Sequence, residues 1–230
     1  MSASTAYRIF LYWLILAGLI AFSAYVGWDL GVLETILARD ITRISVIVLL
    51  LLFFATLHCG YRSWFLTVQL RMAEKLNSRI KEDKGGDIRL FSNGQSLVQE
   101  YLEGLQKGDA EQDKVILSEI MAERLRGTHQ VGWFIAGMVI KLGLLGTVIG
   151  FVLMLSSVSG LDNLDISDIK QLMQQMTQGM GVAMNTTMVG LVSSMLLGMQ
   201  YLLLDRCADQ VVTTGVGIGQ DLCANEPAQE

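Results

Sequence analysis

The sequence predicts an all-α integral membrane protein with four transmembrane helices and a cytoplasmic helical insert between the second and the third. Three observations carry this prediction: the composition, the length of the apolar runs and the position of the basic residues. Of the 230 residues, 52% are hydrophobic and 17% are charged, whereas soluble domains carry about 25% charged residues. The mean hydropathy of +0.45 agrees with a chain that lies largely in a membrane.

Four apolar runs are long enough to cross a bilayer, because a hydrocarbon core of roughly 30 Å needs about 20 residues per helix. They cover residues 9–28, 44–66, 131–158 and 180–204. Arg8, before the first run, would also suit a signal peptide. However, the run is longer than a signal-peptide core of about 7–15 residues and no small-residue cleavage site follows it, so we expect a retained span.

Basic residues predict the orientation of the chain, since loops rich in lysine and arginine stay on the cytoplasmic side. Lysines and arginines collect in the segment between the second and third runs, which holds Arg71, Lys75, Arg79, Lys81, Lys84, Arg89, Lys107, Lys114, Arg124 and Arg126. The loop after the third run instead carries Asp162, Asp165 and Asp168 against Lys170. We therefore expect both termini in the cytoplasm, with short outer loops at residues 29–43 and 159–179.

This topology divides the chain into four parts. Residues 1–43 hold the first span and an outer loop, and residues 44–130 hold the second span and its continuation into a cytoplasmic helical domain. Residues 131–206 form a hairpin of the third and fourth spans, and residues 207–230 form a short cytoplasmic tail. The tail is glycine-rich and polar at its end, so we expect it to fray.

Apolar residues of the insert recur every three or four positions, which predicts helices. Leu70, Ala73, Leu76 and Ile80 extend the second span, and two further periodic segments follow at residues 95–106 and 113–127. Between them, the Gly85-Gly86 and Gly108-Asp109 pairs are natural breaks. The charged faces of these helices suit either a solvated bundle or a specific docking surface.

The sequence carries no sign of an enzyme or a metal site. Its three cysteines, Cys59, Cys207 and Cys223, form no CxxC pair, and His58 and His129 lie near membrane ends, far apart in the chain. Neither a phosphate-binding loop nor a nucleophile elbow is present. A conventional transporter would show an internal repeat, and the two hairpins do not resemble each other. We therefore expect no catalytic residue, no bound metal and no cofactor.

Small residues follow one face of each of the last two spans, which predicts close helix packing. The face of the third span carries Gly143, Gly146, Thr147 and Gly150, and that of the fourth carries Ala183, Thr187, Gly190, Ser194 and Gly198. Their spacing of three and four residues places them on one side of a helix. In lipid, small residues let helix backbones approach closely. The threonines would then bond back to carbonyls of their own helix.

The fourth span is nevertheless unusually polar, with Asn185, Thr186, Thr187, Ser193 and Ser194. Polar groups at membrane depth favour a bundle interior or a water-filled cavity over lipid. Neither span contains a carboxylate, and Asp205 stands only at the end of the fourth. Hydroxyls and amides can solvate a cation but cannot bind and release its charge. If this chain conducts ions by a carboxylate relay, the carboxylate comes from another chain.

Two motifs together resemble the MotA/TolQ/ExbB proton-channel family, the ion-conducting subunits of rotary stators and of Ton and Tol energy transducers. They are GLLGTVIG at residues 143–150 and GVAMNTTMVGLV at residues 181–192. The chain from the third span onward carries the resemblance. Four spans with the large loop between the second and third resemble the motor stators, whereas ExbB and TolQ lack one N-terminal span. The GLLGT sequence of this motif is closer to ExbB and TolQ.

The resemblance implies a homopentamer around a dimer of a single-span partner similar to MotB, ExbD or TolR, whose transmembrane aspartate carries the ion. Thr147 and Thr187 match the threonines that face this aspartate, and Thr186 and Asn185 stand beside Thr187 in the implied ion pathway. Ion passage would turn the pentamer around the partner in the bacterial inner membrane. The alternative is a non-conducting membrane scaffold of packed helical hairpins.

The chain departs from the family pattern at several positions. Val139-Ile140-Lys141 stands where the family often has a proline, and Val182 stands where ExbB-like members carry a glutamate. A charge at the bilayer centre costs on the order of 3 kcal/mol, so we expect Lys141 to snorkel toward the cytoplasmic surface. Thr186 beside Thr187 resembles sodium-driven stators, although the two side chains point about 100° apart on an ideal helix. The transported ion is therefore a proton or sodium.

Overall fold

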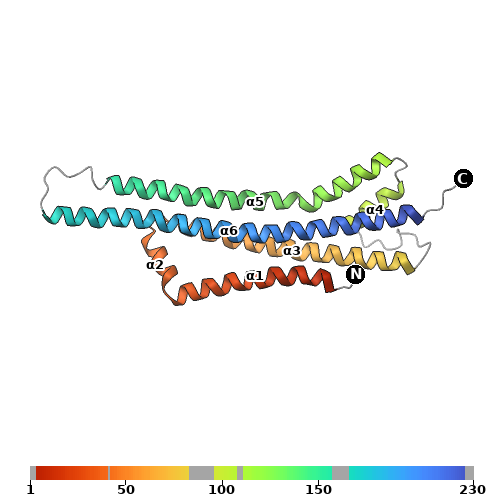
Figure 1. Ribbon diagram of the computed structural model, residues 1–230, viewed down its shortest axis with the longest axis horizontal. Helices are drawn as coiled ribbons and strands as arrows, with labels where there is room; N and C mark the ends of the chain where they lie inside the picture. The colour runs from red at the N-terminus through yellow and green to blue at the C-terminus, as the bar shows by residue number, and fades with distance from the viewer. Residues whose placement is uncertain (1–3, 41, 83–95, 108–110, 157–165, 226–230) are drawn as a thin grey trace. The chain divides into compact units, whose positions relative to one another are not determined.

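A computed structural model of the chain describes residues 4–40, 42–82, 96–107, 111–156 and 166–225 (Figure 1). All secondary structure in these residues is helical. The elements are α1 (Ser4–Asp29), α2 (Val32–Arg39), α3 (Ile44–Glu82), α4 (Leu97–Lys107), α5 (Glu111–Ser156) and α6 (Ile166–Asn225). The predicted all-helical class is confirmed for the described part of the chain.

Four of these helices contain segments that are long and apolar enough to cross a membrane, as predicted. The candidate spans are Phe10–Asp29, Ile44–Ser78, Lys114–Ser156 and Leu172–Leu222. Each of the last three exceeds the roughly 20 residues that a bilayer core requires. The spans and the helices of the insert are therefore not separate elements. In α3 and in α5, one uninterrupted helix contains both an apolar run and a charged segment.

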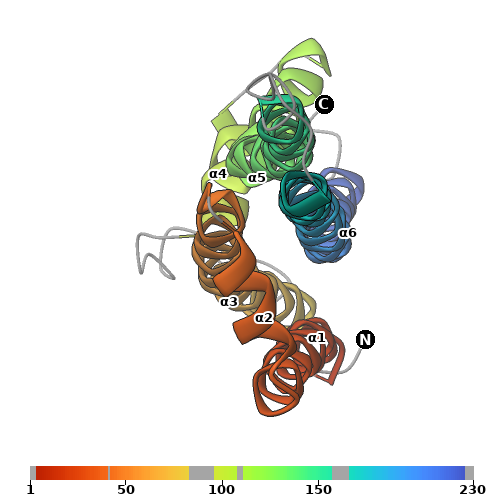
Figure 2. The ribbon, with the colours of Figure 1, turned by 90° about the vertical axis from the view of Figure 1, so that its left-hand side faces the viewer.

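The chain forms two compact units. We call Met1–Ile15, Cys59–Val131 and Tyr201–Glu230 the insert unit, and Leu16–His58 and Gly132–Gln200 the hairpin unit. Figures 1 and 2 show α5 and α6 running side by side, and contacts described below place them in direct contact within the hairpin unit.

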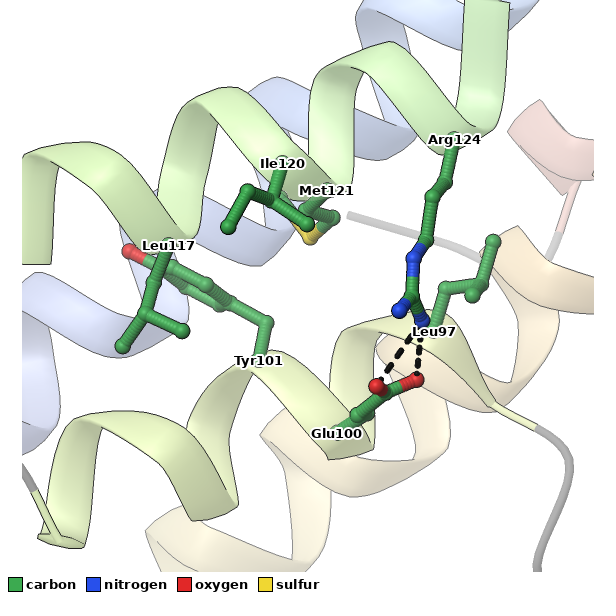
Figure 3. Close-up of a pocket in the computed structure, with 7 residues that line it drawn as sticks. All are labelled: Leu97, Glu100, Tyr101, Leu117, Ile120, Met121 and Arg124. Atoms are coloured by element: carbon green, nitrogen blue, oxygen red, sulfur yellow. Dashed lines mark hydrogen bonds and ion pairs between the residues drawn. The ribbon is translucent and has the colours of Figure 1, made fainter. Parts of the chain in front are cut away.

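The insert unit is organised around α4, which is amphipathic. Val98, Tyr101, Leu102 and Leu105 are all buried at steps of three and four residues. A Cβ on Gly104 would lie 3.1 Å from the Leu117 side chain of α5. Figure 3 shows the pocket between these two helices, where Arg124 of α5 reaches down to Glu100 of α4. The predicted helices of the insert are therefore present, and their apolar faces pack inside the protein.

The prediction that the C-terminal tail frays is wrong as far as Asn225, where α6 ends. Val211 and Ile218 are buried. A Cβ on Gly215 would lie 3.2 Å from Met121, and one on Gly219 would lie 2.7 Å from Leu105. The glycines of this segment thus leave room for neighbouring side chains against the α6 backbone. The prediction had taken them as a sign of a flexible tail.

The segments predicted as outer loops, residues 29–43 and 159–179, are partly helical. Residues 166–179 belong to α6 and residues 32–39 form α2. Gly31 adopts a φ of 67° just before α2, a conformation that costs glycine little. The rest of the second predicted outer loop, the two predicted glycine breaks of the insert and the end of the tail lie outside the described residues.

Asp40 organises the turn that leads into α3. Its carboxylate accepts hydrogen bonds from the backbone N–H of Ser45 at 2.6 Å and from the Thr42 hydroxyl at 2.6 Å. Burial by itself would raise the pKa of Asp40, but the hydrogen bonds from Thr42 and Ser45 prevail and lower it. A carboxylate at a helix N-terminus also meets the positive end of the helix dipole.

We predict that Asp40→Ala lowers the stability of the protein by about 1–2 kcal/mol at neutral pH, because a helix cap is lost. Since the folded-state pKa is below the unfolded value, this stabilisation is complete above that unfolded value. It is lost as the pH falls through the folded-state pKa. Thermal unfolding in detergent from pH 7 to pH 3 measures the effect. The difference from wild type should shrink in acid, while the exposed Asp29→Ala control should match wild type throughout; a constant difference would contradict this role.

Candidate functional site

The α5–α6 hairpin is held by direct backbone contact between two glycines. A Cβ added to Gly190 of α6 would lie 2.8 Å from the Cα of Gly143 on α5 and 3.2 Å from the carbonyl oxygen of Val139. Further along, a Cβ on Gly150 would lie 2.8 Å from Ala183. No larger side chain fits at these points unless the helices separate. Lipid tails are as apolar as the side chains, so helices gain little in lipid by burying apolar surface against each other. Close packing of this kind is what holds them together.

Thr186 occupies the space that Gly146 leaves open. Its side chain is fully buried, and a Cβ on Gly146 would lie only 2.6 Å from the Cβ of Thr186. The Thr186 hydroxyl donates within its own helix, to the Val182 carbonyl at 2.9 Å. The neighbouring Val182, where ExbB-like members carry a glutamate, is buried as well.

Thr187 links the two helices through its hydroxyl. Its Oγ1 lies 3.1 Å from the Ala183 carbonyl of α6 and 3.2 Å from the Gly143 carbonyl of α5. Ser194 makes a similar crossing bond, 2.9 Å long, to the Ala136 carbonyl of α5. The structure therefore brings Thr187, Ser194 and the small residues of α5 together along one contact.

The remaining predicted site residues lie at the edges of this contact. The Thr147 hydroxyl donates to the Leu144 carbonyl one turn earlier on α5. Thr147 and Asn185 are half-buried, and Lys141 is exposed. Ser193, which the sequence analysis noted only for its polarity, is buried.

One polar contact of the hairpin unit was not predicted. Gln200 of α6 is fully buried, and its amide nitrogen donates to the Thr56 hydroxyl of α3 at 3.2 Å. A glutamine inside the apolar stretch MLLGMQYLLL was the available signal, because a polar side chain at membrane depth requires a partner. Its partner could not be identified from the sequence, since Thr56 lies in another span.

Apart from the exposed Lys141 and the indole of Trp133, the polar groups of this hairpin are hydroxyls, amides and backbone carbonyls. Residues 132–156 and 172–200 contain no aspartate or glutamate. Within the described part of the chain, no three His, Cys, Asp or Glu side chains come close enough to hold a metal ion. The hairpin can therefore offer oxygen ligands and hydrogen bonds to a passing ion, but it carries no group of its own that takes up a proton near neutral pH.

These features define a multi-pass helical membrane protein whose last two spans meet through glycines and hydroxyls. The chain belongs to the MotA/TolQ/ExbB proton channel family, whose sequence profile matches residues 90–214, that is 125 of 230 residues. Comparisons with curated proteins and with solved structures found no match. The predicted family is thus confirmed, and the match begins earlier than predicted, so that it includes α4.

Family membership implies the general role of the protein. It is a channel subunit of a motor or transport stator complex and not an enzyme, and the family forms complexes with MotB-, ExbD- or TolR-type partners.

We predict that Gly190→Val destabilises the protein by about 2 kcal/mol or more, because the added methyls meet the backbone of α5 and force the helices apart. Gly181→Val is the matched control on the same helix, since nothing lies within 4 Å of a Cβ at that position. Thermal unfolding of both variants in mild detergent measures the difference. Equal unfolding temperatures would show that the close contact at Gly143 does not support the fold.

Proposed function

We propose that the protein is the ion-conducting subunit of an inner-membrane rotary motor. It couples the flow of protons, or of sodium, to mechanical work through a single-span partner that carries the ion-binding aspartate. One observation carries this proposal: the α5–α6 hairpin is lined with hydroxyls yet lacks any carboxylate of its own. A polar face without a titratable group suits a passage in which another chain supplies the charge.

Thr187 and Thr147 are the proposed contacts of that aspartate. A threonine hydroxyl has one donor and two acceptor positions, and the hydroxyls of both residues currently donate to backbone carbonyls. A carboxylate that arrives at this face would replace a carbonyl as the acceptor, and a protonated carboxylic acid would instead donate to the hydroxyl oxygen. The first exchange needs the hydroxyl hydrogen to turn about the Cβ–Oγ1 bond, and the second uses an acceptor position of the same oxygen. Half-buried Asn185 is the proposed amide of the same path.

Thr186 fits the helix contact better than an ion site. Its burial between α5 and α6 and its bond to the Val182 carbonyl leave it facing Gly146. This position favours protons over sodium as the transported ion, because a second oxygen ligand beside Thr187 would be needed for sodium. Gly143, Gly146, Gly150, Ala183, Gly190 and Ser194 are accordingly the proposed packing residues.

The exposed face of α6 differs from those of the other spans, which supports its contact with a partner helix. Six methionines on it are between 51% and 75% exposed: Met173, Met180, Met184, Met188, Met195 and Met199. By contrast, exposed aromatic side chains lie on α1, α3 and α5, as with Phe22, Phe53 and Phe151, and none lies on the described part of α6. Methionine is flexible and polarisable and adapts to changing apolar surfaces. A helix that turns past α6 would meet such a surface.

The assembly and orientation belong to the same proposal. The ten lysines and arginines between the second and third spans support cytoplasmic termini, and the family resemblance supports a homopentamer around a partner dimer. A non-conducting scaffold is the second candidate, and the observation in its favour is that the hydroxyls of Thr147, Thr186, Thr187 and Ser194 already have backbone acceptors.

We predict that the chain co-purifies in mild detergent with a single-span protein encoded beside it, and that native mass spectrometry finds five chains with two partners. A cysteine at Met184 should then form a disulfide with cysteines in the partner's span, whereas one at the exposed Leu50 of α3 should not, because in this proposal α5 and α6 face the partner and α3 does not. A stable assembly without a partner would favour the scaffold.

We predict that Thr187→Val lowers ion flux through the reconstituted complex by about tenfold or more, since a hydrogen bond to a charged group contributes about 1.5–3 kcal/mol. Thr187→Ser should retain most of the flux. Thr177→Val is the control, because the Thr177 hydroxyl bonds only one turn back, to Met173, on an exposed part of α6. Flux is measured in proteoliposomes with and without sodium. Unchanged flux in Thr187→Val would remove this residue from the ion path.

A further inference from the structure

A second polar cluster joins α5 to α6 in the insert unit, apart from the hydroxyls of the hairpin. Arg126 and His129 lie one turn apart on α5, and Asp205 and Asp209 lie one turn apart on α6. The Nδ1 of His129 is 2.8 Å from a carboxylate oxygen of Asp205, and Arg126 forms an ion pair with Asp209. Each carboxylate therefore has its own basic partner across the helix contact.

The two pairs differ in their access to water. The side chains of Arg126 and Asp209 are 52% and 54% exposed, so water and salt screen their attraction. In the other pair, the side chain of His129 is 2% exposed and that of Asp205 is 34% exposed. Asp205 thus connects a buried imidazole to the protein surface.

Other charged and titratable groups near this pair come from three helices. On α3, Arg62 donates to the Leu125 carbonyl at 2.9 Å, one turn before His129, and the buried Cys59 lies close enough to interact electrostatically with Asp205. On α6, Tyr201 and Cys207 are buried beside Cys59. Arg124 of α5 is engaged with Glu100 of α4 at 2.8 Å (Figure 3).

The surroundings of His129 have opposite effects on the protonation of its imidazole. The Asp205 carboxylate favours the imidazolium form, whereas burial favours the neutral form. Histidine is the side chain whose charge changes in the physiological range. With a neutral imidazole, α5 and α6 share one hydrogen bond at this point; with a second proton on the ring, they share an ion pair.

We propose that His129 and Asp205 form a proton-binding site that ties the α5–α6 contact of the insert unit to the pH of the adjoining aqueous phase. The ligand is a proton, bound at the imidazole and stabilised by the Asp205 carboxylate. The site is defined by geometry in the insert unit and does not depend on ion conduction, so its test and those of the proposed function fail independently.

The test is a titration of the full-length protein in lipid bilayers, labelled with ¹⁵N-histidine and followed by NMR. His58 and His129 are the two histidines of the chain, so His58→Gln assigns the signals. We expect the His129 signal to titrate between about pH 5 and pH 8. Its midpoint should fall by about one pH unit or more in Asp205→Asn and should stay within a few tenths of a unit in Asp209→Asn, the matched control one turn away.

Failure of His129 to titrate in this range, or the same midpoint in Asp205→Asn as in wild type, would overturn the proposal. A second measurement covers the case in which Asp205→Asn does not fold. The unfolding temperature of the wild type should depend on pH across the same range, and His129→Gln should lose that dependence while His58→Gln keeps it. An unchanged dependence in His129→Gln would also overturn the proposal.

Discussion

The contact between Gly143 and Gly190 is the constraint on which the hairpin unit depends. The backbones of α5 and α6 touch there, and the hydrogen bonds between these two helices within the hairpin unit depend on that approach. The hydroxyl of Thr187 reaches the Gly143 carbonyl, and that of Ser194 reaches the Ala136 carbonyl, because no side chain at Gly190 keeps the helices apart. Since a lipid environment offers little hydrophobic drive for association, the polar contacts and the close packing reinforce each other.

The same rule applies in the insert unit with different consequences. Gly215 and Gly219 bring the end of α6 against Met121, Leu105 and Tyr101. These neighbours are long side chains and not backbone, so the contact is an ordinary apolar core. One helix therefore uses glycine in two ways, for backbone contact with α5 in the hairpin unit and for side-chain docking around α4 in the insert unit.

Much of the fold could be predicted from the sequence because it depends on local patterns. Span length and helical periodicity predicted α1, α3, α5 and α6, and the spacing of small residues predicted which faces of α5 and α6 hold glycines. The structure of residues 207–225 could not be predicted, because glycines at positions 215, 217 and 219 fit both a frayed tail and a packed helix. Only the presence of α4 as a neighbour decides between them.

The pairs missed by the sequence analysis share one physical cause. Gln200 with Thr56 and His129 with Asp205 each join side chains that are far apart in the chain. The spacing of residues in the sequence predicts which side chains share a face of one helix. It does not predict which other helix packs against that face. A buried glutamine or histidine indicates that a hydrogen-bond partner exists. Which residue is the partner depends on how the neighbouring helices are placed along each other.

On the proposed function, the two faces of α6 have opposite mechanical properties. The side toward α5 consists of glycine, threonine and serine in backbone contact, and such packing admits no gradual displacement, because even one added methyl meets main-chain atoms. The exposed side carries six methionines, whose rotamers interconvert easily and whose sulfur tolerates many contact geometries. Rotation past a partner helix needs both: a hairpin that keeps its shape while force passes through it, and a surface that fits several positions of the partner about equally well. A face of bulky aromatic side chains would hold the partner in one position, and a loosely packed hairpin would absorb the work as internal motion.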